Sequence, residues 1–160
     1  MGKRNILVTG GLGFIGSHTV LCLDAAGYNP IIIDNLHNSR IEVLDALESL
    51  LGYRPTYVQG DVNDAALLNG LFVSHQPEAV IHFAAHKAVG ESVENPLMYY
   101  HNNVVGLITL LDAMKSNGCH KMVFSSSCTV YGEPESVPVK ESTPTRPAAS
   151  PYGATKQMAE

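Results

Sequence analysis

Short apolar runs alternate along the chain with longer segments of helical pattern, and this alternation limits the possible folds more than any other feature. The apolar runs are rich in β-branched residues, and they cover residues 5–9, 30–34, 56–60, 79–83 and 121–126. Their nearly continuous hydrophobicity is typical of strands that are buried on both faces. Strands separated by helices predict a parallel sheet with right-handed crossovers. We therefore expect an α/β fold built on a doubly wound parallel sheet.

The sequence also marks the ends of the intervening helices. Gly27 is a C-terminal signal for a helix over residues 14–26. Residues 39–42 have the spacing of a capping box, which predicts that the next helix begins there. Asn63 is the expected cap of a third helix. A proline at residue 96 predicts the start of a helix of about 20 residues that runs to the glycine at 118.

The C-terminal part combines an irregular stretch with one more helix. Residues 132–151 contain five prolines, which predicts a long connection without regular structure. Pro151 then begins a helical pattern that reaches Glu160 without a cap or stop signal. We therefore expect a longer natural protein that is cut inside a helix, so that residues 1–160 form one incomplete domain and a substrate-binding domain is absent.

Composition argues against several classes of function. The formal net charge is −5 and no basic run is present, which disfavours a nucleic-acid partner. No apolar run reaches the roughly 18 residues of a membrane span, and no signal peptide is apparent. Three cysteines without a C-x-x-C pair favour free thiols in a reducing cytoplasm, and seven scattered histidines favour no metal site. We therefore expect a cytoplasmic protein without a metal.

A glycine-rich turn follows the first predicted strand. Residues 9–16 read TGGLGFIG and contain G-x-G-x-x-G at Gly11, Gly13 and Gly16. A strand precedes the motif and a helix follows it, which is the context that a dinucleotide-binding turn needs. Such glycines let the backbone approach a pyrophosphate, and the helix N-terminus offers free N–H groups to it. The turn predicts a Rossmann-like site, with an ordinary glycine-rich turn as the alternative.

Two aspartates follow the next strands. Asp34 ends the second strand 18 residues after Gly16, about the spacing at which a carboxylate binds the hydroxyls of adenosine ribose. A carboxylate there repels the 2′-phosphate of NADP, and Arg40 is the only cation close by in the sequence, so NAD is favoured. Asp61 follows the third strand and is placed to reach the adenine, although a helix N-cap is an alternative role for it.

A tyrosine, a lysine and a serine form a candidate reactive group. Tyr152 and Lys156 share a helix face because they are four residues apart. A lysine ammonium beside a phenol stabilises the phenolate, and so does a helix N-terminus, so Tyr152 is a candidate general base. Residues 125–127 are serines at the end of the fifth strand, where ligands bind in open parallel sheets. The spacing of Tyr152 and Lys156 and the run of serines each also occur by chance, so they indicate a catalytic site only together with the other motifs.

Together these motifs resemble the extended short-chain dehydrogenase/reductase family. The resemblance rests on TGGLGFIG at 9–16, DN at 34–35, GDV at 60–62, SSSCTVYG at 125–132 and YGATK at 152–156. It narrows to the UDP-sugar 4-epimerases of that family through DNLHNS at 34–39, HFAAHKAVGESVENP at 82–96 and YYHNNVVG at 99–106. It covers the whole chain, but only about the N-terminal half of such an enzyme.

The resemblance implies NAD as the cofactor and assigns the residues that contact it. In chain order these are Gly10, Gly13, Phe14, Ile15, Gly16, Asp34, Asn35, Leu36, His37, Asn38, Ser39, Asp61, Val62, Phe83, Ala84, Ala85, His86, Lys87 and Asn102. For Asn102, the alternative is a buried asparagine bonded to backbone. Ser127, Tyr152 and Lys156 are implied as the catalytic residues, and they contact the cofactor as well.

The implied reaction is the NAD-dependent interconversion of UDP-glucose and UDP-galactose at the 4-position of the sugar, in galactose metabolism. Tyr152 takes the proton of the 4-hydroxyl, the hydride passes to NAD and returns to the other face of a 4-keto sugar, and Ser127 bonds the reacting oxygen. The implied partners are the UDP-sugar and a second copy of the protein, packed through the helices that begin at Pro96 and Pro151.

Other functions stay open at this point. A uronate epimerase or a dehydratase of the same family is one alternative, although dehydratases carry an acid next to the hydroxyl residue of the site, whereas Cys128 and Thr129 follow Ser127. A non-catalytic NAD-binding module is an alternative of another class. We expect the isolated 160-residue chain itself to be inactive, because most contacts to the sugar nucleotide are missing.

Overall fold

A parallel sheet of five strands forms the centre of the computed structural model, which describes residues 2–160. The strand order is β3-β2-β1-β4-β5. The strands are β1 (Asn5–Thr9), β2 (Asn29–Asp34), β3 (Thr56–Gln59), β4 (Ala79–His82) and β5 (Met122–Phe124). The central strand β1 pairs with β2 and β4, so that Leu7 lies opposite both Ile31 and Val80. The predicted parallel α/β sheet is therefore confirmed.

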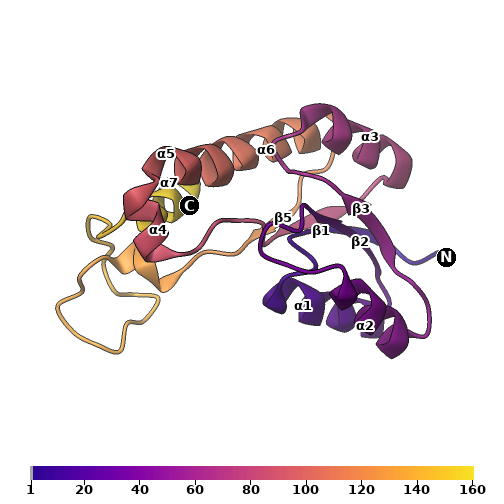
Figure 1. Ribbon diagram of the computed structural model, residues 1–160, viewed down its shortest axis with the longest axis horizontal. Helices are drawn as coiled ribbons and strands as arrows, with labels where there is room; N and C mark the ends of the chain where they lie inside the picture. Colours follow the sequence, from indigo (N-terminus) through magenta and orange to yellow (C-terminus); the bar gives the residue numbers. More distant parts are fainter. Residues whose placement is uncertain (1) are drawn as a thin grey trace. The chain divides into compact units, whose positions relative to one another are not determined.

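Helices connect these strands, as Figure 1 shows. They are α1 (Phe14–Ala25), α2 (Glu42–Leu51), α3 (Ala65–His75), α4 (Val89–Glu94), α5 (Pro96–Tyr100), α6 (Gly106–Ser116) and α7 (Pro151–Ala159). A π-helical turn, η1 (His101–Val105), joins α5 to α6, and a 3₁₀ turn, η2 (Cys128–Tyr131), follows β5. Within residues 2–160, no helix combines the length and the apolar character that crossing a membrane requires.

The chain divides into two compact units. The first unit comprises the residues up to Ala84 together with Thr109–Ser125, and it contains the whole sheet. The second unit comprises Ala85–Ile108 and Ser126–Glu160. In the second unit, α7 packs against α4, α5, η1 and η2, so helices and turns replace the sheet as its framework.

The core of the first unit lies on both faces of the sheet, because successive strand residues point to opposite sides. Val8 and Ile32 pack against α1 and α2, in a cluster completed by residues such as Leu44. Leu7 and its neighbours on β2 pack on the other face, in a cluster whose helical members are Leu68, Leu71, Phe72, Leu110, Ala113 and Met114. Two buried faces explain why the strands have no alternating polar residues.

Two of the predicted helix starts differ in the structure, and a third predicted helix is interrupted. Ser39 does not cap α2, which begins at Glu42 with Ile41 at the N-cap position, and its hydroxyl donates to the carboxylate of Asp34 at 2.6 Å. Asn63 does not cap α3, since Asp64 accepts the N–H of Leu67 and Asn63 binds Asp61 instead. The helix expected from residue 96 does begin with its proline at the first turn, but η1 interrupts it. The short helix α4 was not predicted.

Substitution of a fully buried leucine should destabilise the first unit. Leu68→Ala removes a side chain of 0% exposure from the cluster on the α3 face, so we expect the free energy of unfolding to fall by about 3 kcal/mol. Leu50→Ala, at a position that is 71% exposed, should change it by less than about 0.5 kcal/mol. Urea unfolding followed by circular dichroism measures both values, and equal losses in the two variants would contradict the assigned core.

Candidate active site

The glycine turn between β1 and α1 is packed so closely that Gly10 and Gly16 have no room for a side chain. Gly10 has a φ of +66°, which is the left-handed region. A Cβ atom on Gly16 would lie 2.3 Å from the carbonyl oxygen of Gly10, and one on Gly10 would lie 2.8 Å from the amide nitrogen of Ala84. The N-cap Gly13 offers no side chain to the first turn of α1, so the N–H groups of that turn stay available to an anion.

The carboxylate of Asp34 ties this turn to the loop that follows β2. One of its oxygens accepts the N–H of Leu12 at 3.0 Å, and the other accepts the N–H of Leu36 at 2.9 Å. Leu36 has a left-handed φ of 62°, a conformation that costs a non-glycine residue free energy and that this hydrogen bond supports. Asp34 is buried, so it organises both loops from within.

Asn35 links this loop to the end of β3. Its side-chain amide donates to Asp61 at 2.8 Å. The other carboxylate oxygen of Asp61 accepts the N–H and the side-chain amide of Asn63. Val62 is buried beside it. The residues that the sequence assigned to adenosine thus form one connected group, in which His37 and Asn38 are exposed.

Residues 83 and 84 lie against the same turn. The N–H of Phe83 donates to the carbonyl oxygen of Thr9 at 3.1 Å, and the N–H of Ala84 donates to the Thr9 hydroxyl at 3.2 Å. That hydroxyl also bonds the ring of His82 at 2.7 Å. Phe14 and Ile15 are largely exposed beside the turn, at 79% and 59%. The first unit therefore brings together the predicted residues from Gly10 to Ala84.

Helix α7 carries the candidate base and the lysine. Ser150 caps the helix by accepting the N–H of Gly153 at 3.1 Å, and Pro151 occupies its first position, as predicted. Tyr152 therefore lies in the first turn, and Lys156 follows one turn later; both are buried. Burial lowers the pKa of Lys156 to about 8. The Tyr152 hydroxyl makes no hydrogen bond to any other residue of the described range 2–160.

Ser127 is the N-cap residue of η2, and η2 packs against α7. The Ser127 hydroxyl accepts from the N–H and the hydroxyl of Thr129, at 3.3 Å and 3.1 Å. A Cβ atom on Gly153 would lie 3.2 Å from the carbonyl oxygen of Thr129, so the glycine lets α7 approach η2 closely. Because both bonds use only its lone pairs, Ser127 keeps its own proton for a further acceptor.

A buried asparagine next to the predicted one joins two parts of the second unit. Asn103, not Asn102, is buried. Its side chain accepts the N–H of His86 at 2.8 Å, and it donates to the carbonyl oxygen of His86 and to the hydroxyl of Thr155, both at 3.0 Å. Asn102 is half-buried and donates to Asn103. The π-helical turn brings Asn103 inward, and sequence periodicity carries no signal for such a turn.

The other predicted site residues of the second unit differ in how exposed they are. Ala85 is half-buried, His86 is buried, and Lys87 is exposed. Tyr99, which the sequence did not single out, is fully buried and lies with its ring at 6.4 Å from that of Tyr152. Within residues 2–160, no group of three or more histidine, cysteine or acidic residues is arranged to hold a metal ion.

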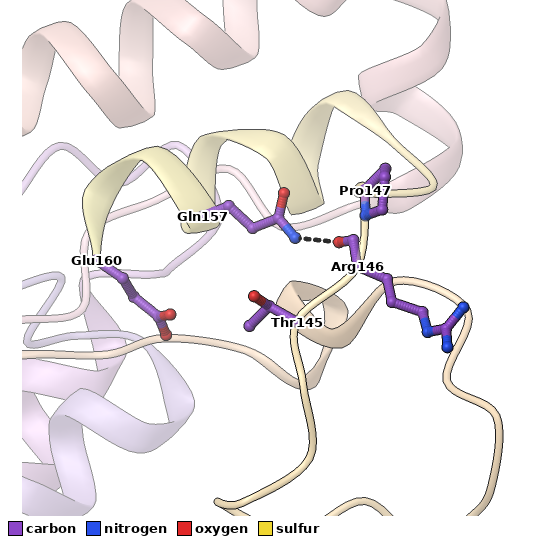
Figure 2. Close-up of a pocket in the computed structure, with 5 residues that line it drawn as sticks. All are labelled: Thr145, Arg146, Pro147, Gln157 and Glu160. Carbon is purple, nitrogen blue, oxygen red and sulfur yellow. Dashed lines mark hydrogen bonds between the residues drawn. The ribbon is translucent and has the colours of Figure 1, made fainter.

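A hollow of about 380 Å³ lies beside α7 but does not contain the reactive residues. It is lined by Thr145, Arg146, Pro147, Gln157 and Glu160, as Figure 2 shows. Its wall is held by Gln157, whose amide donates to the carbonyl oxygen of Arg146 at 2.5 Å. Since neither Tyr152 nor Lys156 lines it, the chemistry of the side chains, rather than this hollow, defines the candidate site.

The family follows from comparison with known proteins. Residues 7–160 match the family model described as GDP-mannose 4,6 dehydratase. The chain belongs to that family, within the extended short-chain dehydrogenases/reductases. Two similar relatives are UDP-glucose 4-epimerases: one from Yersinia pestis is 52% identical over 155 residues, and one from Arabidopsis thaliana is 49% identical over 160. The alignments cover 97% and 98% of this chain but 46% and 45% of the relatives, so the chain spans about half their length.

Solved structures agree with the fold. The UDP-glucose 4-epimerase of Bifidobacterium longum, in complex with NAD⁺ and UDP, superimposes with a TM-score of 0.94 at 44% identity, over 98% of this chain and 47% of that one. The enzyme of Stenotrophomonas maltophila, with bound NAD and a formylated UDP-arabinopyranose, gives 0.92 at 44% identity, over 97% and 46%. The predicted Rossmann-like fold is therefore confirmed.

The buried ammonium of Lys156 should make the fold less stable at neutral pH. Its folded-state pKa of about 8 lies below the ordinary 10.5, so the penalty is full below pH 8 and fades as the pH approaches 10.5. Lys156→Met should therefore raise the free energy of unfolding at pH 7 by about 2 kcal/mol, since other contacts of the ammonium offset part of the gain.

Urea unfolding at several pH values measures this gain, which should shrink above pH 8. The matched control is Lys115→Met, at an exposed position of α6, which should show no gain at any pH. A Lys156→Met variant that is less stable than the parent at pH 7 would contradict the assigned cost of burial.

Proposed function

We propose that this chain carries the NAD-binding and proton-transfer residues of an enzyme that interconverts UDP-glucose and UDP-galactose. The observation that carries the proposal is the pair on α7: a buried tyrosine whose hydroxyl has no hydrogen-bond partner among residues 2–160, one turn before a buried lysine. The relatives named above are UDP-glucose 4-epimerases, and residues 82–106 are the stretch that points to the same substrate.

The first unit fits NAD on its own geometry. A chain with a Cβ at residue 10 or 16 cannot close the turn, and this close packing leaves the N–H groups of α1 facing outward for a pyrophosphate. Asp34 uses three of the acceptor positions of its carboxylate and keeps another, which suits a ribose hydroxyl and disfavours the 2′-phosphate of NADP. Phe14 and Ile15 supply exposed apolar surface beside the turn.

We assign the rest of the predicted contact residues to the same cofactor. Residues 34–39, Asp61 and Val62 are proposed for the adenosine end. Phe83, Ala84, Ala85, His86, Lys87 and Asn102 are proposed for the nicotinamide end, together with Ser127, Tyr152 and Lys156. Bound NAD would supply the redox chemistry by accepting and returning a hydride at C4 of the sugar.

The protein's own residues move the proton. Tyr152 in its ionised form accepts the proton of the 4-hydroxyl and later returns it. The ammonium of Lys156 lies on the same helix face, and the first turn of α7 adds the partial positive charge of a helix N-terminus, so both favour the phenolate. The Ser127 hydroxyl donates a hydrogen bond to the oxygen at C4 and thereby holds this oxygen in place.

Lys156 sets an upper limit to the working pH range. Because burial lowers its pKa to about 8, the ammonium persists at neutral pH and is lost above pH 8. Loss of this charge removes support for the phenolate. The proposed enzyme therefore works best at neutral pH.

A homodimer in the cytoplasm completes the proposal. Val93, Leu97 and Ile108 of the second unit expose 62%, 81% and 53% of their surface, and Met158 of α7 exposes 64%. Exposed apolar side chains on neighbouring helices are typical of surfaces that a partner covers. We propose that a second copy packs on the helices that begin at Pro96 and Pro151, and that the protein serves galactose metabolism.

Replacement of Gly16 should weaken NAD binding. Gly16→Ala forces a methyl group against the carbonyl oxygen of Gly10, so we expect the dissociation constant for NAD to rise by at least about tenfold. Titration calorimetry on the 160-residue chain measures it. Gly70→Ala is the matched control, because this helical glycine has open space around it, and it should leave NAD binding unchanged. A parent chain that does not bind NAD would overturn the proposal.

Turnover should depend on the tyrosine hydroxyl but NAD binding should not. The test joins residues 1–160 to the remaining part of the Yersinia pestis relative. This chimera should interconvert UDP-glucose and UDP-galactose without added NAD, whereas the 160-residue chain alone should not. Tyr152→Phe in the chimera should lower kcat by at least about a hundredfold while NAD stays bound, because the proton acceptor is lost. Unchanged turnover in this variant would refute the assignment of the base.

A further inference from the structure

Tyr99 contacts two parts of the candidate site from inside the second unit. Its side chain has 0% exposure. Its ring lies edge-on to that of Tyr152, with centroids 6.4 Å apart and an angle of 77° between the planes. The ring of His86 lies 5.5 Å away and is tilted by 52°. Both distances fall in the range of attractive aromatic pairs, and in the Tyr99–Tyr152 pair the edge of one ring meets the face of the other.

The hydroxyl of Tyr99 makes two hydrogen bonds, one as a donor and one as an acceptor. It donates to the carboxylate of Glu91 at 2.6 Å, and it accepts the N–H of Ala88 at 3.0 Å. A phenol has one proton, so these two bonds fix the direction of donation and prevent rotation of the C–O bond. Burial, together with the bond to Glu91, raises the pKa of Tyr99 to about 12. Tyr99 therefore stays protonated at neutral pH and does not compete with Tyr152 as a base.

Asn103, which lies in η1, contacts the same two segments as Tyr99: the one around His86 and helix α7. It bonds the backbone of His86 at one end and the hydroxyl of Thr155 at the other. Thr155 in turn donates to the carbonyl oxygen of Tyr152 at 2.7 Å. Asn103 thus fixes the backbone of α7 near Tyr152. The ring of Tyr152 can still rotate about its own side-chain bonds, and Tyr99 is the aromatic residue that contacts that ring.

We propose that Tyr99 is a positioning residue for Tyr152: the hydrogen bond to Glu91 sets the plane of the Tyr99 ring, and this ring holds the ring of Tyr152 in one orientation. The inference rests on the proposed function, since Tyr152 is the base of that reaction. Tyr99 itself transfers no proton. Its contribution is orientation, and a small misplacement of a reacting group is enough to slow a reaction strongly.

The first test observes the Tyr152 ring directly in the 160-residue chain. Tyrosine labelled with ¹³C in the ring gives NMR signals, and Tyr152→Phe identifies those of residue 152. Tyr99→Leu removes the ring contact and should shift and broaden these signals. Tyr99→Phe keeps the ring but loses the bond to Glu91, so it should shift these signals about as far as Glu91→Ala does and less far than Tyr99→Leu. Tyr53→Phe is the matched control: the Tyr53 hydroxyl also donates to a carboxylate, that of Asp24 at 2.7 Å, and its loss should leave the Tyr152 signals unchanged.

Substitutions of Glu91 separate orientation from packing. Glu91→Gln keeps an oxygen that accepts the Tyr99 proton and should preserve the Tyr152 signals, whereas Glu91→Ala removes the acceptor and should shift them. Tyr99→Phe combined with Glu91→Ala should shift them no further than Glu91→Ala alone, because both changes break the same bond. Should Tyr99→Leu fail to fold, Glu91→Ala decides: unchanged Tyr152 signals in this variant would overturn the proposal.

The second test measures turnover in the chimera described above. Tyr99→Leu should lower kcat by about tenfold or more with little change in KM, and Tyr99→Phe, which keeps the ring but not the bond to Glu91, should recover only part of the loss. An equal kcat in the folded Tyr99→Leu variant and the parent would refute a positioning role. The two tests keep the failures apart: an inactive chimera contradicts the proposed function, whereas NMR signals of Tyr152 that ignore Tyr99 contradict this inference.

Discussion

The contact between Gly16 and the carbonyl oxygen of Gly10 is the constraint on which the first unit depends. It brings the start of α1 against the end of β1, at a distance that only a residue without a side chain allows. From that position α1 covers one face of the sheet together with α2. Asp34 then connects the turn to the loop after β2 through the N–H of Leu12. The glycine at residue 16 is thus a packing requirement, and the same glycine is the one that the proposed NAD site needs at this turn.

Much of this arrangement could be predicted from the sequence, because it depends on local rules. The strands followed from runs that two buried faces require, and the start of α7 followed from Ser150 and Pro151. Ser39 and Asn63 are the two exceptions: each has the side chain of a cap, but in the structure each donates to a nearby carboxylate and neither accepts an N–H of the helix that follows. Capping patterns do not include partners that only the fold supplies.

The interior of the second unit was the least predictable part. The sequence predicts one long helix from Pro96, and the structure interrupts it with a π-helical turn in which Asn103 is buried and Asn102 is half-buried. A turn of this kind breaks the 3.6-residue period, so periodicity does not indicate which of the two asparagines faces inward. Tyr99 had no signal at all, since a buried tyrosine looks like any other aromatic core residue until its hydrogen bonds are known.

Helix α7 combines two opposing effects. Burial disfavours the ammonium of Lys156, and the lowered pKa of about 8 records this cost. The proposed reaction needs the same charge, because it favours the phenolate form of the neighbouring tyrosine. A pKa near 8 satisfies both demands at neutral pH: the lysine stays charged, and the charge is far less screened than at the surface. Burial, together with the bond to Glu91, raises the pKa of Tyr99 to about 12, so this second phenol stays protonated at neutral pH. The two phenols therefore have different environments: the Tyr99 hydroxyl bonds Glu91 and Ala88, whereas the Tyr152 hydroxyl has no hydrogen-bond partner within residues 2–160.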